Sequence, residues 1–338
     1  MENFEEYLRQ GEPKQAEKVK DWKTAIGLQQ VDGLKPSEFL IATAKQNIEG
    51  YISIEEVTQR IDLYYQQHPS KAAEDRTEEA DKVSARIVAI LGEQIFTFSP
   101  AEYLSINRRL FQGIYRFAGK IRDYNISKQE WVLDGETILY GSAESLKATL
   151  EYDFEQEKKF SYKGLSQQEA TEYIAYFISY LWQIHVFGEG NTRTTAIFLI
   201  KYLRTFGFNV NNELFEQHSW YFRNGLVRYN YKNFKKDVYN TNEFLLRFFE
   251  NLLLDEKHAL KNRVMHIHYS DTVKSPNDTV NDTVFALIKE NNKITATEIG
   301  ERLQMSVSTV RRKIKELKNN NKLERIGSDK TGYWKIYS

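Results

Sequence analysis

The chain has 338 residues, 41% of them hydrophobic and 28% charged, and its 47 basic and 47 acidic side chains balance to a net charge of zero. This length and composition predict a globular protein of two or three domains, and the absence of cysteine excludes disulfides and thiolate metal sites. The sequence has neither an apolar run near the ~20 residues that span a bilayer nor the apolar core of a signal peptide, so we expect a cytoplasmic protein.

Residues 1–78 are predicted to form a helical N-terminal region. Within it, a helix is expected over residues 37–50, because Ser37 is a typical N-cap and a glycine closes the segment. A second helix is expected over residues 53–67, where apolar side chains recur at helical spacing. The polar stretch 69–78 is expected to be a loop that ends this region.

Residues 79–254 are expected to form the main domain, and most of this range shows the periodicity of amphipathic helices. The stretch 121–140 differs, because it is rich in residues that favour strands. It contains Asp134 followed by Gly135, a dipeptide typical of tight hairpin turns. We therefore expect a β-hairpin on an otherwise helical domain.

Residues 255–282 are expected to be a linker, and residues 283–338 follow the pattern of a small winged helix-turn-helix domain whose third helix spans 306–318. Residues 281–338 hold 12 Lys and Arg against 7 Asp and Glu, a net charge of +5, whereas the first 280 residues carry −5. A basic tail on an acidic body indicates a nucleic-acid partner. The third helix would present to DNA the residues Ser308, Thr309, Arg311, Arg312 and Lys315.

The segment HVFGEGNTR, which begins at His185, places an unusual mixture of groups between two strongly apolar helical stretches. A lone histidine among apolar residues is usually a packed core residue, but a packed loop rarely needs a glutamate, an asparagine and an arginine as well. Gly188 and Gly190 let backbone N–H groups converge, and the following helix points its positive N-terminus at the same place. The segment therefore predicts an anion site, such as one for a polyphosphate, with His185 as base, Glu189 as metal ligand and Arg193 as charge clamp.

The same residues resemble the signature of the Fic (Fic/DOC) family, H-x-F-x-(D/E)-G-N-(G/K)-R-x-x-R, which here reads HVFGEGNTRTTA from His185 to Ala196. The resemblance covers roughly residues 37–254 and implies a mainly α fold, a Fic-type helical bundle with a β-hairpin flap. Enzymes of this family transfer the AMP of ATP to a Ser, Thr or Tyr hydroxyl of a target protein and release pyrophosphate. The resemblance thus implies a protein adenylyltransferase that uses ATP and Mg²⁺ and modifies a target protein or itself.

The resemblance also implies a role for each residue of the motif. His185 would accept the proton of the attacking hydroxyl, and Glu189 would bind Mg²⁺. The groups expected to bind the phosphates of ATP belong to the loop itself: Gly188, Gly190, Asn191, Thr192 and Arg193. Two further sets are expected to contact nucleotide or target. The first is the flap edge, formed by Asn125, Ile126, Ser127 and Lys128. The second is a group of aromatic residues in an adenine pocket: Tyr221, Phe222 and Tyr229. Each of these aromatic residues is equally compatible with a place in the core.

The chain departs from the signature where Ala196 replaces the second arginine. In the family this arginine contacts the γ-phosphate and pairs with a glutamate of an inhibitory helix. The end of the predicted helix 37–50 resembles such a helix, with Glu49 in the place of the inhibitory glutamate, although Lys45 stands where the family has Ser or Thr. We hypothesise that Glu49 restrains the enzyme through a partner other than residue 196; the alternative is a helix end with an incidental glutamate.

Two other functions remain open on the sequence. A Fic-type enzyme can have a different outcome, phosphotransfer or the removal of AMP, and the missing second arginine does not decide between them. The chain can instead be a DNA-binding regulator whose Fic body senses nucleotide, although winged helices also bind proteins. The sequence identifies neither the target protein nor the DNA site, the oligomeric state or the preferred metal.

Overall fold

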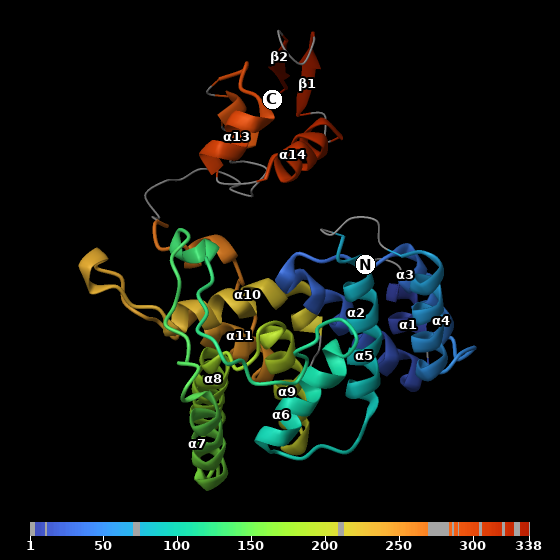
Figure 1. Ribbon diagram of the computed structural model, residues 1–338, viewed down its shortest axis with the longest axis vertical. Helices are drawn as coiled ribbons and strands as arrows, with labels where there is room; N and C mark the ends of the chain where they lie inside the picture. The colour runs from blue at the N-terminus through green and yellow to red at the C-terminus, as the bar shows by residue number, and fades with distance from the viewer. Residues whose placement is uncertain are drawn as a thin grey trace. The chain divides into compact units, whose positions relative to one another are not determined.

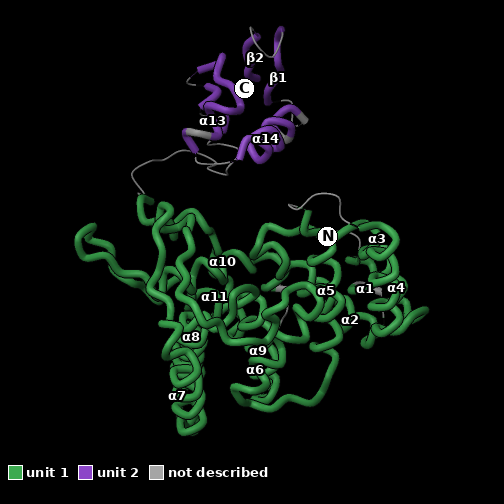
Figure 2. Tube along the Cα trace, viewed as in Figure 1, with its two compact units in different colours: residues 1–269 green, residues 270–338 purple. Residues whose placement is uncertain are grey.

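The computed structural model divides into two compact units, residues 1–269 and residues 270–338, which are described separately (Figure 2). The structure describes residues 4–10, 12–69, 75–208, 213–269, 284–285, 287–289, 291–303, 306–319, 322–327 and 332–337. The expected linker 255–282 is thus divided: residues 255–269 belong to the first unit, and the remainder lies outside the described residues. None of the helices in the described ranges is long and apolar enough to cross a membrane.

The first unit begins with four helices (Figure 1). They are α1 (Glu5–Gln10), α2 (Pro13–Gln29), α3 (Glu38–Ile48) and α4 (Ile54–Gln67). At the start of α3 the Ser37 hydroxyl accepts a hydrogen bond from the backbone N–H of Leu40, and at the start of α4 Ser53 forms a capping box with Glu56. Both helices predicted in this region are therefore confirmed, together with the predicted cap at Ser37, and the capping box at Ser53 is added by the structure.

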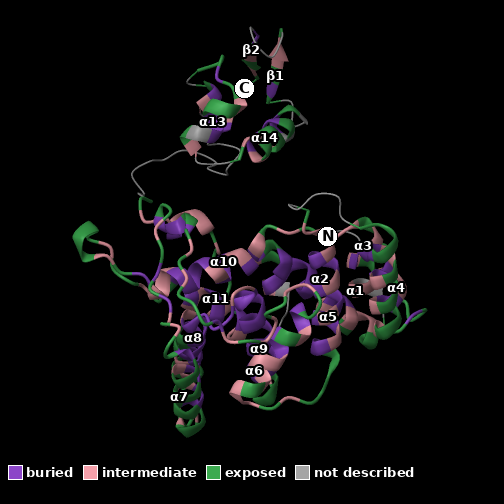
Figure 3. Ribbon diagram, in the orientation of Figure 1, coloured by how far each residue is buried: buried purple, intermediate pink, exposed green. Residues whose placement is uncertain are grey.

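Helix α9 lies at the centre of the first unit. The helices of the main domain are α5 (Thr77–Gly92), α6 (Pro100–Phe111), α7 (Leu146–Lys159), α8 (Gln167–Ile184), α9 (Asn191–Thr205), α10 (Glu213–Asn230) and α11 (Glu243–Leu253). Every residue of α9 from Asn191 to Leu203 is buried, and the helix packs against α5, α6 and α8 (Figure 3). The mainly α fold is confirmed, and the loop 185–190 between α8 and α9 is held at the core of this unit.

Residues 121–140, which we call the flap, double back on themselves as predicted, but they do not form a β-hairpin (Figure 1). The turn is the expected one, because Asp134 and Gly135 both have positive φ, 56° and 81°. Helix η3 (Trp131–Leu133) occupies the limb before the turn, so the backbone groups there bond within a helical turn. These backbone groups therefore cannot form continuous strand pairing with the residues after the turn. The two expected strands are absent from this described segment.

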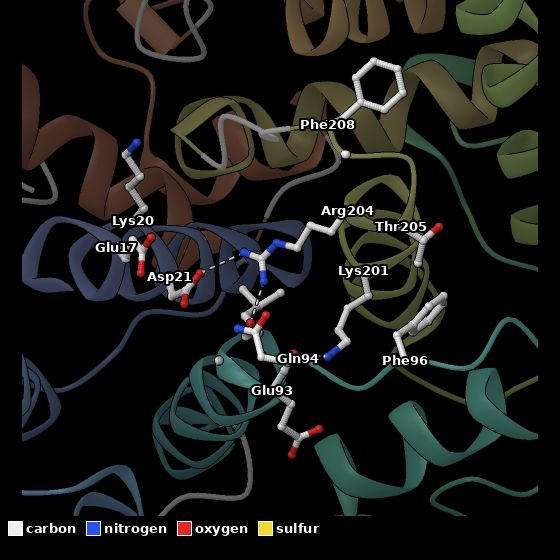
Figure 4. Close-up of a pocket in the computed structure, with 13 residues that line it drawn as sticks. Glu17, Lys20, Asp21, Glu93, Gln94, Phe96, Lys201, Arg204, Thr205 and Phe208 are labelled. Atoms are coloured by element: carbon white, nitrogen blue, oxygen red, sulfur yellow. Dashed lines mark hydrogen bonds and ion pairs between the residues drawn. The ribbon is translucent and has the colours of Figure 1, made fainter. Parts of the chain in front are cut away.

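A cavity of about 540 Å³ opens where α5 and α9 end, and its lining contains no residue of the predicted motif (Figure 4). Two of its basic residues, Lys201 and Arg204, are engaged by the fold. The Lys201 ammonium donates to the carbonyls of Ile90 and Glu93 at 3.0 and 2.7 Å, and Arg204 donates to the carbonyl of Leu91 at 2.5 Å. Lys201 and Arg204 thus cap carbonyls at the end of α5.

The second unit contains the elements of the predicted winged helix. They are α13 (Ala296–Leu303), α14 (Val307–Asn319), β1 (Leu323–Ile326) and β2 (Tyr333–Ile336). The strands pair antiparallel, with Leu323 opposite Ile336. On α14 the side chains of Val310, Ile314 and Leu317 are buried, as the helical pattern predicts. The predicted turn at 304–305 and the wing residues 328–331 lie outside the described residues.

Candidate active site

The loop between α8 and α9 is a tight turn that depends on unusual backbone positions. His185 ends α8 in the left-handed conformation (φ 52°), and Gly190 precedes α9 in the same region (φ 76°). A Cβ at Gly190 would lie 2.1 Å from the ring of Phe111, and a Cβ at Gly188 would lie 2.7 Å from the Tyr124 hydroxyl. The buried Phe111 ring thus leaves no room for a side chain at Gly190, and Gly188 lies directly against the Tyr124 side chain of the flap.

The side chains of Asn191 and Thr192 brace the loop from within. The Asn191 amide donates to the carbonyl of Phe187 at 2.8 Å and accepts from the N–H of the same residue at 3.0 Å. The indole N–H of Trp182 donates to the Thr192 hydroxyl at 2.9 Å. The Asn191 side chain is therefore occupied in bracing the loop, whereas the Thr192 hydroxyl, which only accepts from Trp182, keeps its own proton to donate.

The backbone N–H groups of residues 188–193 donate to no group within the described part of the chain. They surround the left-handed Gly190 at the N-terminus of α9, where the helix dipole favours negative charge. Unpaired N–H groups at a helix N-terminus are the feature that the predicted nest requires. They are the backbone donors that the loop would offer to a polyphosphate.

His185 is buried, and neither of its ring nitrogens has a hydrogen-bond partner among the described residues. The imidazole packs against the rings of Tyr140 and Trp182, with centroid distances of 4.3 and 5.4 Å. Burial holds the pKa of His185 well below its usual value, and the positive charges of Lys128 and Arg223 lower that pKa further. The imidazole is therefore neutral near pH 7 and keeps a lone pair that can take a proton.

The Glu189 carboxylate lies on the accessible side of the loop, with its Oε2 atom 3.6 Å from the Lys128 Nζ atom of the flap. The described residues contain no group of three or more His, Asp and Glu side chains that could hold a metal ion. A single accessible carboxylate beside an anion nest fits Mg²⁺, which commonly binds one or two carboxylates together with phosphate oxygens and water. Glu189 would therefore hold Mg²⁺ as part of a nucleotide complex.

Arg193 does not face the loop but lies in a buried ionic cluster. Its guanidinium is completely buried and reaches the carboxylates of Glu79 and Asp32 at 2.7 and 2.8 Å. It also donates to the side-chain carbonyl of Gln29 at 2.9 Å and lies 4.7 Å from the centre of the Phe111 ring. The expectation that Arg193 clamps the phosphates is not met in this structure, because two carboxylates already neutralise its charge.

Glu49 is not one of the carboxylates that contact the motif. It follows the last residue of α3, and its carboxylate accepts a hydrogen bond from the Tyr7 hydroxyl. The short helix η2 (Gln30–Asp32), directly after α2, brings Asp32 to Arg193 instead. The structure thus corrects the hypothesis on Glu49: the N-terminal region does reach the motif, but through Asp32.

The aromatic residues expected in an adenine pocket lie in different surroundings. Phe222 is buried between Phe215 and Phe248, at ring distances of 5.3 and 5.0 Å, and Tyr221 is completely buried as well. These two residues pack the core, so their assignment to the pocket is corrected. Tyr229 is half-buried and remains a candidate.

The four residues expected at the flap edge differ in their surroundings. Asn125 is exposed and accepts a hydrogen bond from the N–H of Ala143 at 2.9 Å, Ser127 is exposed, and Ile126 packs partly against the core. Lys128 is the one whose described contacts place it at the motif loop, through Glu189. Of the four expected residues Lys128 reaches the motif loop, while Tyr140 of the flap packs against His185.

Three residues that shape the site were not predicted from the sequence: Arg122, Asn107 and Glu79. Arg122 is buried, and its Nε donates to the carbonyl of His185 at 2.8 Å, which fixes the backbone of the candidate base. The Asn107 amide on α6 donates to the carbonyl of Glu189 at 3.3 Å. Each of them reaches the site through a partner that is distant in the sequence, and for Glu79 this partner is Arg193, so no local pattern indicates that contact.

Helix α14 of the second unit carries the residues predicted to contact DNA. Thr309 is partly buried, and its N–H donates to the Ser306 hydroxyl at 3.2 Å, which caps the helix. The other four are exposed: Ser308, Arg311, Arg312 and Lys315. This helix thus has the polar and basic outer face that DNA binding requires, while contact with DNA stays a prediction.

Comparison with known proteins matches the two units to two family models. The Fic/DOC family model matches residues 97–203, about a third of the chain, and an HTH domain model matches residues 280–333. No curated protein matches the chain significantly. A Fic family protein from Desulfovibrio desulfuricans G20 is similar in structure, with 12% identity and a TM-score of 0.44, over 99% of this chain and 93% of that chain. The N-terminal FIC domain of Bep8, a VirB-translocated effector protein from Bartonella sp. 1-1C, has 16% identity and a TM-score of 0.39, over 60% of this chain and 87% of that chain.

Proposed function

Residues 97–203 form a domain of the Fic/DOC family, and from this premise we propose that the chain transfers the AMP of ATP to a Ser, Thr or Tyr hydroxyl of a target protein or of the chain itself. One observation carries the proposal: the neutral imidazole of His185, with both nitrogens unpaired among the described residues, adjoins the unpaired N–H groups of residues 188–193. A base and a phosphate cradle in one loop are the two parts that this chemistry needs.

In the proposed reaction a ring nitrogen of His185 takes the proton of the target hydroxyl. The hydroxyl oxygen then forms a bond to the α-phosphorus of ATP, and the bond from that phosphorus to the bridging oxygen breaks to release pyrophosphate. The backbone N–H groups of residues 188–193 would stabilise the phosphates, and Arg122 keeps the histidine backbone in place. Mg²⁺ held at Glu189 would neutralise phosphate charge.

Access to His185 requires a movement of the flap, because the imidazole is only 3% exposed. The Lys128 side chain, 28% exposed, forms with Glu189, 38% exposed, a pair of the kind that typically contributes less than ~1 kcal/mol. Separating this contact therefore costs little. Mg²⁺ bound at Glu189 would compete with the Lys128 ammonium for this carboxylate, whereas the net negative charge of the magnesium–nucleotide complex would attract the ammonium.

Intact-mass analysis of the full chain, incubated with ATP and Mg²⁺, tests the proposal. We expect a mass gain equal to one adenylyl group. A gain equal to one phosphate would instead establish phosphotransfer, and loss of AMP from a previously modified protein would establish the reverse reaction. No change on the chain, or on any protein of a cell extract supplied with labelled ATP, would contradict transferase activity altogether.

Asp32→Ala is expected to raise the rate of AMP transfer on the order of tenfold, the size of a typical coupling between sites. Asp32 holds the Arg193 guanidinium at 2.8 Å, and its loss would leave Arg193 with a single carboxylate and more freedom to turn toward phosphates. The measurement is the initial rate of mass gain at several ATP concentrations. Glu49→Gly is the matched control, since Glu49 contacts Tyr7 and not Arg193; equal effects of both variants would contradict the restraint by Asp32.

A second function, DNA binding by the second unit, is favoured by the exposed basic face of α14 and by the HTH match. The double variant Arg311→Glu/Arg312→Glu is expected to weaken binding of the full chain to duplex DNA, and to reduce the salt dependence by about one unit of slope for each lost phosphate contact. Fluorescence anisotropy over a range of salt concentrations measures both. The control is Lys158→Glu/Lys159→Glu on α7; equal losses would contradict a specific role for α14.

A further inference from the structure

A loop of eleven residues, 231–241, projects between α10 and α11 as a separate lobe, which we call the arm (Figure 1, gold). Backbone hydrogen bonds close its base in both directions: the N–H of Asn233 donates to Val238 at 2.8 Å, and the N–H of Val238 donates to Asn233 at 3.1 Å. Helix η4 (Phe234–Lys236) forms its tip, followed by Asp237 in the left-handed conformation. The arm therefore has a defined shape, which a solvent-facing loop does not need.

The arm exposes aromatic rings that the described part of the chain leaves largely uncovered. Phe234 is 67% exposed and Tyr239 is 59% exposed, and their ring centroids are 5.7 Å apart. The ammonium of Lys232 lies 5.8 Å from the centre of the Phe234 ring. Adjacent exposed rings favour a binding partner, because burying such rings in a contact yields a large gain in free energy.

The charge of the arm is opposite to that of the body that carries it. Lys232, Lys235 and Lys236 outnumber Asp237, so the arm carries +2, whereas the first 280 residues together carry −5. All four of these charged residues are exposed. A local basic surface on an acidic body draws an acidic partner to this place in particular.

The arm is joined to the flap through Glu136. The Lys236 ammonium and the Tyr231 hydroxyl both bond to the Glu136 carboxylate, and the Asn233 amide donates to it at 3.3 Å. The opposite limb of the flap carries Lys128, which contacts Glu189 of the motif loop. The flap thus connects the candidate site to the arm, and a cavity of about 400 Å³ opens along it, lined by Ser127, Lys128, Gln129, Gly135, Glu136 and Thr137.

We propose that the arm docks an acidic segment of the target protein, with Phe234 and Tyr239 packing on an apolar side chain of that segment and Lys232 and Lys235 pairing with its carboxylates. This inference rests on the proposed function, because the segment belongs to the protein whose hydroxyl His185 would activate. The connection through the flap favours a protein segment over a nucleic acid, since the flap leads from the arm to the candidate base.

The test uses the full chain with a single fluorinated phenylalanine in place of Phe234, so that the ¹⁹F signal reports occupancy of the arm alone and not of the basic second unit. Three probes are titrated: a peptide of aspartate and glutamate around one leucine and one tyrosine, the same peptide with lysine in place of each acid, and a short oligothymidylate. We expect a saturable shift with the acidic peptide, weakened by salt, and none with the basic peptide.

The double variant Lys232→Glu/Lys235→Glu should lower the affinity for the acidic peptide by about tenfold or more. The control variant Lys147→Glu/Lys163→Glu should leave this affinity unchanged. Tyr239→Ala should weaken it as well. No shift with the acidic peptide, or the same binding in the charge-reversed variant, would overturn the proposal, and a stronger response to the oligothymidylate would assign the arm to nucleic acid. Because no nucleotide is present, the result is independent of whether the chain transfers AMP.

Discussion

Replacement of His185 by alanine is expected to abolish the ATP-dependent mass gain, with a loss in rate of about 10²- to 10⁴-fold, the usual contribution of a general base. The imidazole is the group at the loop that is neutral, buried and unpaired within the described residues, and it adjoins the unpaired N–H groups of residues 188–193. The measurement is a time course of intact mass for both proteins with ATP and Mg²⁺.

Two controls make the result on His185 interpretable. The alanine variant removes only ring packing against Tyr140 and Trp182, so its circular dichroism and urea unfolding should show a folded protein. His258→Ala removes an accessible histidine that pairs with Glu250, and it should keep the full rate. A mass gain that persists in the His185 variant would rule out this residue as the base.

The pH dependence follows from the lowered pKa of His185. Because burial and nearby positive charges hold the pKa well below 6.5, the imidazole stays in its neutral, proton-accepting form as the pH falls from 8 toward 6.5. The ratio kcat/KM, which reports the ionisation of the free enzyme, should therefore show no inflection near pH 6.5. The same shift makes the folded state less stable as the pH falls below 6.5, since the unfolded chain then binds the proton more readily.

The sequence predicts local features of this fold well. The cap at Ser37 and the turn at Asp134 and Gly135 depend on neighbours within a few residues, and both are found. The tight loop at His185 is also found, because its glycines and the apolar helices around it lie in one continuous segment. In each case the physical cause is contained in the local sequence.

Pairings over long sequence distances could not be predicted in this way. Arg193 meets Gln29 and Glu79, which are 164 and 114 residues away, and nothing near either residue distinguishes it from an ordinary surface group. Glu49 resembles the family's inhibitory glutamate more closely in local sequence than Asp32 does. In the structure, however, the Glu49 side chain contacts Tyr7 and not Arg193. Phe222 shows the same limit, since an aromatic residue on a helix has the same pattern in a core and in a ligand pocket.

Glu79→Ala is expected to lower the free energy of unfolding by about 3–5 kcal/mol, the usual cost of removing one partner of a buried ion pair. The Glu79 carboxylate is 6% exposed and accepts hydrogen bonds from Arg76 at 2.7 and 2.8 Å, from Arg193 at 2.7 Å and from the Tyr115 hydroxyl at 2.9 Å. Alanine would leave the completely buried Arg193 with only Asp32 to neutralise it. Urea unfolding of the full chain measures the loss.

The neighbouring Glu78 provides a matched control for Glu79. Its carboxylate is 38% exposed and pairs with Lys82 at 2.8 Å, so Glu78→Ala should cost less than ~1 kcal/mol. A similar loss of unfolding free energy in the two variants would show that the loss comes from a change in helix α5 and not from the cluster around Arg193. In a double-mutant cycle with Arg193→Met, the combined variant should lose less than the sum of the single losses, because the second change removes the unpaired charge.

Acid should weaken the same cluster, and the sign follows from the pKa of Glu79. Burial alone would raise this pKa, but the hydrogen bonds and charges of Arg76 and Arg193 outweigh burial and hold it below 4.5. The contribution of Glu79 is therefore complete above pH 4.5 and is lost as the pH falls through the lowered pKa. The difference in unfolding free energy between wild type and Glu79→Gln should shrink on acidification below pH 4.5; a difference that stayed constant there would mean that the ion pairs around Arg193 do not stabilise the fold.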